Sequence, residues 1–126
     1  VYAVDLYHYA ARNEPFECFL RADTALPMLY MPDAIRATIE LMEAPAEKIK
    51  VRTSYNLSGM SFTPAEITAS IRKIKPDFQI SYKPDFRQKI ADSWPASIDD
   101  TAARRDWNWK PEFDLDAMTV DMLKHL

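Results

Sequence analysis

Glycine, cysteine and histidine are scarce in this sequence. Its 126 residues include one glycine, one cysteine and two histidines. Loops that cradle phosphate groups need several residues without a Cβ atom, so a single Gly59 excludes both a G-x-G-x-x-G fingerprint and a P-loop. Cys18 has no partner for an internal disulfide, and with His8 and His125 it cannot assemble an ordinary zinc cluster. We therefore expect these residues to form neither a dinucleotide site nor a metal site.

The sequence also lacks strong positive charge and long apolar runs. Its formal net charge is −3, which argues against a nucleic-acid-binding surface. No apolar run approaches the roughly 20 residues that span a bilayer, so we expect no membrane partner. The opening residues VYAVDLYHYAARNEP have no apolar block behind a basic end and do not resemble a signal peptide. Together with the lone cysteine, these features favour the reducing interior of a cell.

No complete catalytic arrangement is recognisable in the sequence. No serine lies in a G-x-S-x-G motif, and none of the six tyrosines is followed four residues later by a lysine. Cys18 lies in an apolar, strand-like pattern, which favours burial over a role as a nucleophile. His8 is expected to pack in the core or to make a satisfied polar contact. The pair Asp99 and Asp100 is expected to begin a helix rather than to form a carboxylate dyad. The sequence therefore predicts no catalytic residue.

Helical and strand-like segments alternate along the chain. Expected helices cover residues 1–12, 33–44, 63–75, 85–91, 99–107 and 114–126, and expected strands cover residues 16–20, 28–31, 48–59 and 78–82. This alternation predicts an α/β or α+β fold in one domain, residues 1–126, which is long enough to bury a core. In the second helix, Ile35, Ile39 and Met42 lie at positions i, i+4 and i+7 and form one apolar face.

Polar residues predict where several helices begin. Thr63 and Glu66 flank Pro64 in the pattern of a capping box with proline at the first helical position. Asp33 and Asp114 are each expected to cap the helix that follows, because a carboxylate can accept hydrogen bonds from the free amides of a first turn. The valine at position 1 already lies in an expected helix, with no capping residue before it. The chain is therefore interpreted as a portion of a longer protein, with a complete small domain that has a processed end as the alternative.

One polar segment combines groups that could contact a small ligand. The segment from Arg87 to Trp94 brings together a cation, the carboxylate of Asp92, the hydroxyl of Ser93 and an indole at the end of a short expected helix. An indole offers an apolar face and an N–H donor, which suits closure over a small polar molecule. The residues alone favour packing of Trp94 against its own domain, and the ligand-binding role remains the alternative.

Longer segments resemble a known family of enzymes. The segments are YMPDAIRATIELMEAP, YNLSGMSFTPAEI and WNWKPEFDL. They resemble segments of the extended short-chain dehydrogenases, the group that contains the nucleotide-sugar epimerases. The segment SYKPDFRQKIADSWPASIDD is more specific, and with it essentially the whole chain resembles L-threonine 3-dehydrogenases of the short-chain type.

The resemblance implies part of a two-domain enzyme. Family members have an N-terminal Rossmann domain that binds NAD and a smaller C-terminal domain that shapes the substrate pocket. They oxidise L-threonine to 2-amino-3-ketobutyrate, with the tyrosine of a Tyr-x-x-x-Lys motif as general base. This chain lacks that motif and the dinucleotide fingerprint, so it resembles the C-terminal substrate-binding portion alone, inactive by itself, with NAD bound by the missing domain. The resemblance also implies a homodimer of the full-length protein, in the cytoplasm of a bacterium or the mitochondrial matrix of a eukaryote.

The resemblance further implies roles for individual residues. It places Trp94 near the bound amino acid, with Ser93 and Arg87 as further substrate-binding candidates. Arg87 could instead hold its loop through Asp85 or Asp92. These residues would orient the substrate and exclude water rather than move protons. The alternatives are a fragment of a nucleotide-sugar epimerase or dehydratase, which should present a basic cluster around a diphosphate that this sequence lacks, and a non-catalytic binding module.

Overall fold

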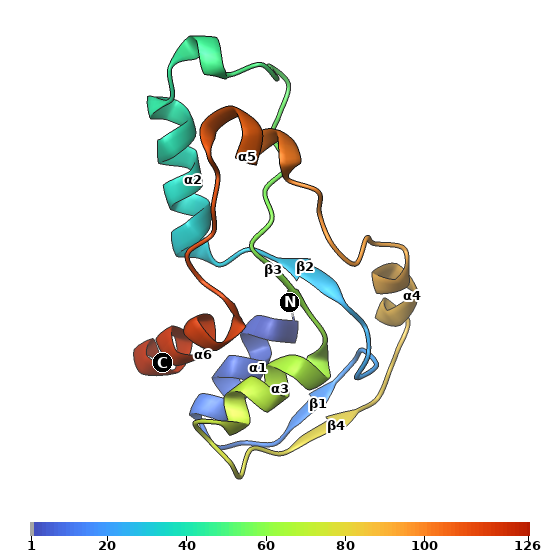
Figure 1. The fold of residues 1–126 in the computed structure, drawn as a ribbon. Helices are drawn as coiled ribbons and strands as arrows, with labels where there is room; N and C mark the ends of the chain where they lie inside the picture. The colour runs from blue at the N-terminus through green and yellow to red at the C-terminus, as the bar shows by residue number, and fades with distance from the viewer. Residues whose placement is uncertain (1) are drawn as a thin grey trace.

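The computed structural model describes residues 2–126 and shows a mixed α/β molecule with two packed parts (Figure 1). In chain order the elements are α1 (Tyr2–Ala11), β1 (Phe16–Cys18), β2 (Leu26–Met28), α2 (Met31–Glu43), a 3-10 turn (Ala46–Lys48), β3 (Met60–Phe62), α3 (Pro64–Arg72), β4 (Ile80–Tyr82), α4 (Arg87–Asp92), α5 (Thr101–Trp107) and α6 (Leu115–His125). The first helix was expected from Val1, which lies outside the described residues. The expected alternation of helices and strands is confirmed.

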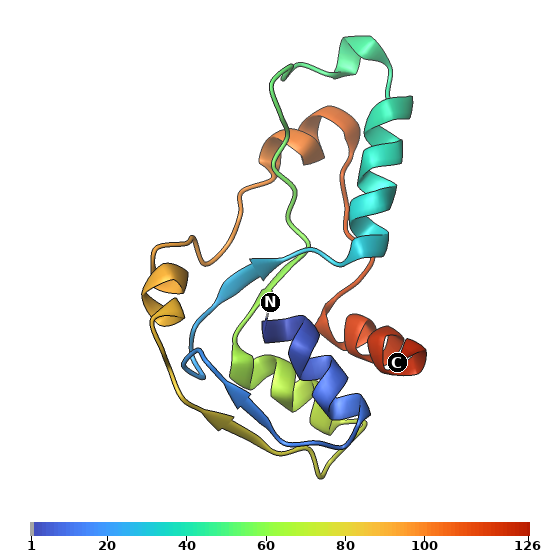
Figure 2. The same cartoon turned by 180° about the vertical axis from the view of Figure 1, so that it is seen from behind.

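The basal part consists of α1, α3, α4, α6 and all four strands. Strand β1 pairs in parallel with β4, and β2 pairs antiparallel with β3. Figure 2 shows both strand pairs curving around α1 and α3. The core of the basal part is one cluster of buried apolar side chains that includes Leu6, Phe62, Ile67 and Ile71. The amphipathic faces of α1 and α3 supply this core, as helices with one apolar stripe must.

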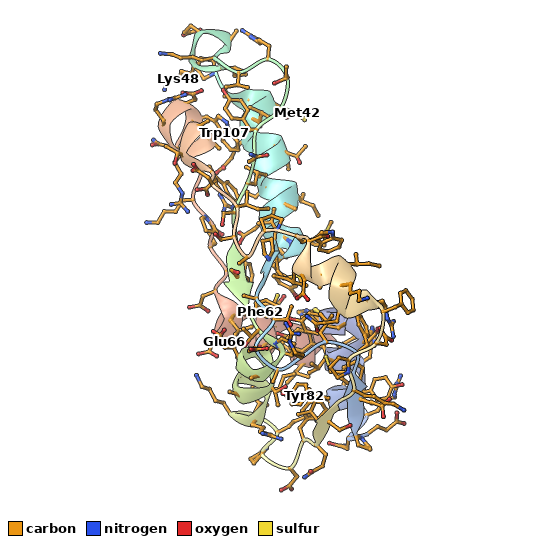
Figure 3. All side chains as sticks on the ribbon, turned by 90° about the vertical axis from the view of Figure 1, so that its right-hand side faces the viewer. Met42, Lys48, Phe62, Glu66, Tyr82 and Trp107 are labelled. Carbon is orange, nitrogen blue, oxygen red and sulfur yellow. The ribbon has the colours of Figure 1, made fainter. Side chains whose placement is uncertain are left out.

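The arm consists of α2, the 3-10 turn, residues 49–59, α5 and residues 108–112. Its smaller core contains Ala37, Ala103, Trp107 and Trp109. The Trp109 indole donates a hydrogen bond to the carbonyl of Ser58 at 3.1 Å, which ties residues 49–59 to the segment after α5. In Figure 3, Trp107 lies on the α5 side of α2, whereas Met42 lies on the opposite side. Only one face of α2 is therefore packed against the described residues.

Two of the three predicted helix caps are present. Thr63 and Glu66 form the capping box, because each side chain accepts a hydrogen bond from the other residue's backbone N–H at 3.2 Å. Asp114 caps α6 by accepting from the N–H of Ala117 at 2.8 Å. Both motifs are local in sequence, so neither depends on distant parts of the chain.

The prediction that Asp33 caps α2 is wrong. The helix begins at Met31, and Tyr30 occupies the N-cap position without a side-chain hydrogen bond. Pro32 in the first turn explains the earlier start, since a helix leaves the first amides unpaired and proline lacks one. The Asp33 carboxylate is only 1% exposed and accepts from the N–H groups of Glu112 and Phe113 at 3.1–3.2 Å. Asp33 therefore joins α2 to the segment before α6.

Two predicted strands are displaced. The strand expected at residues 28–31 forms at Leu26–Met28, because α2 already begins at Met31. The strand expected at residues 48–59 has no ladder with any described residue, and β3 begins only at Met60. A Cβ atom at Gly59 would lie 2.9 Å from the carbonyl oxygen of Met28. The single glycine thus serves the close approach of β3 to β2, and it forms no part of a phosphate loop.

Candidate functional site

Trp94 lies just beyond α4 and is largely exposed. Its backbone N–H donates to the carbonyl of Ala91 at 3.1 Å, which continues the last turn of the helix. Its side chain is 58% exposed, so the described residues cover less than half of it, and the packing against its own domain that the residue types alone favoured is incomplete. Helix α4 lies at the outer edge of the basal part, between β4 and the start of α5 (Figure 1).

A cavity of about 200 Å³ adjoins this tryptophan, and we call it the Trp94 pocket. The pocket is lined by Tyr2, Phe19, Leu20, Leu26, Met28, Arg87, Ile90, Ala91 and Trp94. These residues come from the start of α1, the segment between β1 and β2, strand β2 and α4. The structure therefore brings two of the three predicted site residues, Arg87 and Trp94, to one pocket.

Arg87 is held on two sides. Its guanidinium lies 3.5 Å from the centre of the Phe19 ring and donates to both carboxylate oxygens of Asp85 at 2.6–3.1 Å. These hydrogen bonds raise the pKa of Arg87 and lower the pKa of Asp85, because they stabilise both charged forms. The alternative in which Arg87 holds its loop through Asp85 matches this contact.

Ser93 is not among the residues that line the Trp94 pocket. Its hydroxyl donates to the carbonyl of Ile90 at 2.6 Å, at the C-terminal end of α4. This is the usual local partner for a serine near a helix end. The structure therefore does not place the Ser93 hydroxyl beside Trp94 and Arg87 in the pocket lining.

Gln88 anchors α4, and its role was not predicted from the sequence. Its buried amide accepts from the N–H of Arg21 at 2.7 Å and donates to Thr24 at 3.0 Å and to Asp92 at 2.7 Å. Asp92 thus bonds to Gln88 rather than to Arg87. The contacts with Arg21 and Thr24 span more than 60 residues, so no local pattern could reveal them.

Tyr2 also lines the pocket, and the sequence alone did not predict this role. Its side chain is buried, and its ring lies edge-on to the Phe19 ring with the two ring centres 6.5 Å apart. Its hydroxyl has no hydrogen-bond partner among residues 2–126. Burial is the main cause that raises the Tyr2 pKa above its ordinary value. The hydroxyl is therefore neutral.

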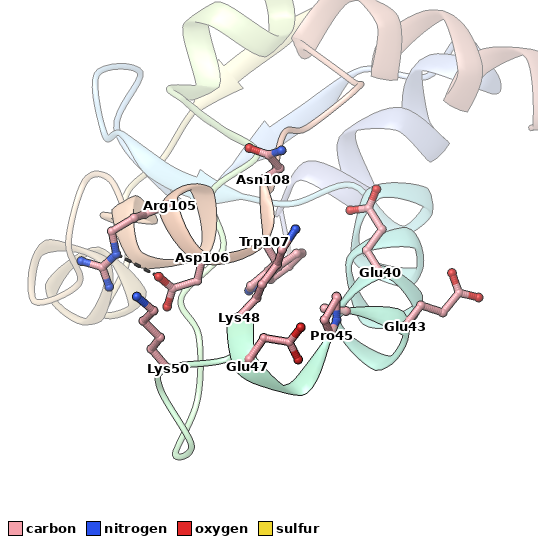
Figure 4. A pocket seen from close by; sticks show the side chains of 11 residues that line it. Glu40, Glu43, Pro45, Glu47, Lys48, Lys50, Arg105, Asp106, Trp107 and Asn108 are labelled. Carbon is pink, nitrogen blue, oxygen red and sulfur yellow. Dashed lines mark hydrogen bonds and ion pairs between the residues drawn. The ribbon is translucent and has the colours of Figure 1, made fainter.

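A larger cavity of about 630 Å³ lies in the arm, between the end of α2 and α5 (Figure 4). Its rim mixes acidic and basic side chains, and Trp107 lies at its centre. Much of this charge is already paired, since Arg105 donates to Asp106 at 2.9 Å and Glu40 accepts from Arg36 at 2.9 Å. None of the predicted site residues lines this cavity, so the Trp94 pocket is the stronger candidate site.

Other expected roles can be compared with the structure. Cys18 is buried, as expected, and its burial raises the pKa of the thiol. His8 is exposed on α1, so core packing, the first of its two expected roles, is wrong. Asp100 precedes α5 and pairs with Arg104 at 2.7 Å, whereas Asp99 accepts from the N–H of Thr101 at 3.0 Å. The acidic pair thus begins a helix, as predicted.

The part of the chain that the structure describes contains no cluster of three or more metal-ligating side chains. Within the same residues, no helix has the length and apolar character needed to cross a bilayer. The one glycine, Gly59, packs closely against Met28 and Leu29.

Comparisons with known proteins give relatives over nearly the whole chain. The mitochondrial L-threonine 3-dehydrogenase of Bos taurus is 52% identical over 97% of this chain and 33% of that protein. A GalE-like L-threonine dehydrogenase structure from Cupriavidus necator has a TM-score of 0.96 and 62% identity, covering 99% of this chain and 45% of that one. An uncharacterised epimerase/dehydratase of Staphylococcus haemolyticus is 47% identical over 98% of this chain and 39% of that protein.

No protein-family model matches the sequence. The chain spans between a third and a half of the length of the relatives it matches. Identity above one half, together with a nearly coincident backbone, extends over almost every residue of this chain. The chain is therefore homologous to one portion of the GalE-like, short-chain L-threonine 3-dehydrogenases.

Proposed function

We propose that this chain is the C-terminal, substrate-binding portion of an NAD-dependent L-threonine 3-dehydrogenase. The observation that supports this most directly is 62% identity to the Cupriavidus necator enzyme over 99% of the chain, combined with coverage of only 45% of that enzyme. Such an enzyme removes the hydroxyl proton and a hydride from C3 of L-threonine, giving 2-amino-3-ketobutyrate, NADH and a proton.

The chain alone is proposed to be inactive. None of its tyrosines has a lysine four residues later, and its residues do not fit a dinucleotide. NAD and the general base would therefore belong to the portion of the protein outside this chain. The role left for these residues is to bind and orient the substrate and to exclude water.

The Trp94 pocket is proposed as the part of this chain that meets the substrate. The immobilised Arg87 lies at the start of α4 and the exposed indole of Trp94 just beyond its end, and Gln88 fixes this helix to the rest of the basal part. A rigid wall of this kind can hold a substrate in one orientation without taking part in proton transfer. Ser93 contributes by ending α4 rather than by contacting the ligand.

The outer face of α2 supports the proposal that a further domain packs here. Four apolar side chains on this face are exposed: Met31 by 63%, Ile35 by 54%, Ile39 by 48% and Met42 by 79%. They lie at positions i, i+4, i+8 and i+11 and form one continuous stripe. A stripe of this kind on a soluble protein marks a packing surface, and the missing Rossmann domain is its proposed occupant.

A fragment of a nucleotide-sugar epimerase or dehydratase is the second candidate. The uncharacterised epimerase/dehydratase at 47% identity is the observation that favours it. A diphosphate would need several unpaired cations, but Arg87 is the only cation in the Trp94 pocket lining and it is already paired with Asp85. The threonine dehydrogenase is therefore the preferred candidate, in a homodimer located in the mitochondrial matrix or the bacterial cytoplasm.

NADH formation by the full-length gene product tests the proposal. We expect turnover with L-threonine and none with UDP-sugars. Trp94→Phe should lower kcat/KM for L-threonine about tenfold, the factor that corresponds to about 1.4 kcal/mol of lost contact. Tyr82→Phe, a change of a partly exposed aromatic on β4 and outside the pocket lining, is the matched control and should leave kcat/KM within about twofold. Absence of threonine-dependent NADH formation would contradict the assignment.

A further inference from the structure

Helix α4 is too short to be stable without contacts to other elements. It has six residues, whereas isolated helices shorter than about 12 residues are marginal in water. Segments without regular structure precede and follow it, and of its own residues only Gln88 and Ala91 are buried. The orientation of α4 therefore depends on the bonds that join it to its neighbours.

Gln88 supplies hydrogen bonds in two directions. Its side-chain oxygen accepts from the backbone N–H of Arg21 at 2.7 Å, and its amide nitrogen donates to the Thr24 hydroxyl at 3.0 Å. The same nitrogen donates to Oδ1 of Asp92, the last residue of α4, at 2.7 Å. Gln88 is only 6% exposed, so water cannot readily replace a bond that is lost, and a buried group without its partner is costly. Gln88 thus joins both the segment before β2 and the end of α4 in one buried network.

The other polar contact between these segments is weaker. The Arg21 guanidinium lies 3.4 Å from Asp92, and both side chains are about half exposed to solvent. Exposed ion pairs contribute little to stability, because water and salt screen them. Ala91 adds the burial of a single methyl group. The end of α4 therefore depends mainly on the Gln88 amide.

The place of α4 determines the place of Trp94. The backbone N–H of Ser93 donates to the carbonyl of Ile90, and that of Trp94 donates to the carbonyl of Ala91, both at 3.1 Å. These bonds continue the last turn of the helix beyond Asp92. A change in the orientation of α4 would therefore move the Trp94 indole with it.

From these contacts we infer that Gln88 is a positioning residue, which acts on turnover by holding α4 and, through it, the Trp94 indole. The inference rests on the proposed function, in which Trp94 meets the substrate, and adds a residue that acts without touching the substrate. Gln88 does not line the Trp94 pocket, and its oxygen and both of its N–H groups already have protein partners. Its effect must therefore pass through another side chain.

A double-mutant cycle on the full-length protein tests whether Gln88 acts through Trp94. Initial rates of NADH formation give kcat/KM for L-threonine in the wild type, Gln88→Met, Trp94→Ala and the double variant. Methionine has nearly the volume of glutamine without its hydrogen bonds, so Gln88→Met should lower kcat/KM about tenfold. In the Trp94→Ala background the same change should have an effect of less than about twofold, because the positioned group is gone. Equal factors in both backgrounds, as a general loss of folded protein would give, would overturn the inference.

A second pair of variants covers the case in which Gln88→Met does not fold. Gln88→Glu keeps the acceptor for the Arg21 N–H but places a carboxylate beside Asp92, so it should lower kcat/KM. Adding Asp92→Asn supplies an amide donor at the end of α4 and should restore kcat/KM to within about threefold of the wild type. Gln79→Glu, at an exposed position before β4, is the matched control and should have an effect of less than about twofold. A double variant no better than Gln88→Glu would count against the inference.

Amide hydrogen exchange provides a measurement that does not depend on turnover. Gln88→Met should speed up exchange in α4 and at Trp94 while leaving α1 and α3 slow, because only the bonds of α4 are removed. Unchanged exchange in α4 would overturn the inference and leave the proposed function intact. A wild-type protein that does not oxidise L-threonine would overturn the proposed function, and with it the effect of Gln88 on turnover.

Discussion

The basal part and the arm are stabilised in different ways. In the basal part, α1, α3 and α6 enclose a continuous core, and buried hydroxyls bridge them: Thr119 bonds to Tyr7 at 2.7 Å and to Ser70 at 2.8 Å. In the arm, a few residues around Trp107 and Trp109 form the core, and the outer face of α2 stays exposed. The basal part therefore has the larger core, whereas the arm has a small core beside a helix whose outer apolar face is exposed.

The largest expected effect comes from removing the centre of the arm core. Trp109→Ala deletes a buried indole that bonds to Ser58 and lies 4.9 Å from the Arg36 guanidinium. Replacing a buried tryptophan by alanine lowers the free energy of unfolding by about 3–5 kcal/mol. Amide hydrogen exchange should speed up in α2 and α5 and stay slow in α1 and α3. Equal acceleration in both parts would show that they unfold as one cooperative unit.

The next effect on stability should be small in the isolated chain and larger in the full-length protein. Ile39→Lys places a charge on the exposed face of α2, so it should alter the stability of the isolated chain by no more than about 0.5 kcal/mol. Sedimentation should show that wild-type chain associates and that the variant does so less. In the full-length protein the same change should lower the melting temperature, because the lysine would be buried. Val120→Lys, on the exposed face of α6, should have neither effect.

The smallest expected effect concerns pH and the basal part. Hydrogen bonds from Lys73 and Ser70 lower the pKa of Asp116 below its ordinary value of 3.8. The folded state therefore binds fewer protons than the unfolded state below about pH 4, so the contribution is present above that pH and is lost as pH falls through the folded-state pKa. Denaturant unfolding between pH 5 and pH 3, values chosen to bracket about 4, should show less loss of stability for Asp116→Asn. The same dependence of the free energy of unfolding on pH in the wild type and the variant would contradict this prediction.

Features set by neighbouring residues could be predicted from the sequence, and those set by distant contacts could not. The capping box at Thr63 and the cap at Asp114 need only the next three residues, and both are present. Asp33 was misjudged because its partners lie 79 and 80 residues away. The missing strand at residues 48–59 has a similar cause, since a strand needs a partner whose position no local pattern reveals.

The candidate site shows the same division. The segment that contains Arg87 and Trp94 was found from its residue types and from its resemblance to a family. Tyr2 and Met28 complete the pocket from elements that lie far away in sequence, and neither has a distinguishing local pattern. Ser93 was included for its hydroxyl, but that hydroxyl bonds to the helix end instead.

The contacts of Asp33 also set an order of events during protein synthesis. Its partners Glu112 and Phe113 are made about 80 residues later, which takes on the order of 4–16 s at typical ribosomal rates. Until then, α2 leaves the ribosome with a carboxylate whose backbone partners do not yet exist. The arm can mature only after these partners have been translated, so α2, with its apolar stripe, stays open to a chaperone during this interval.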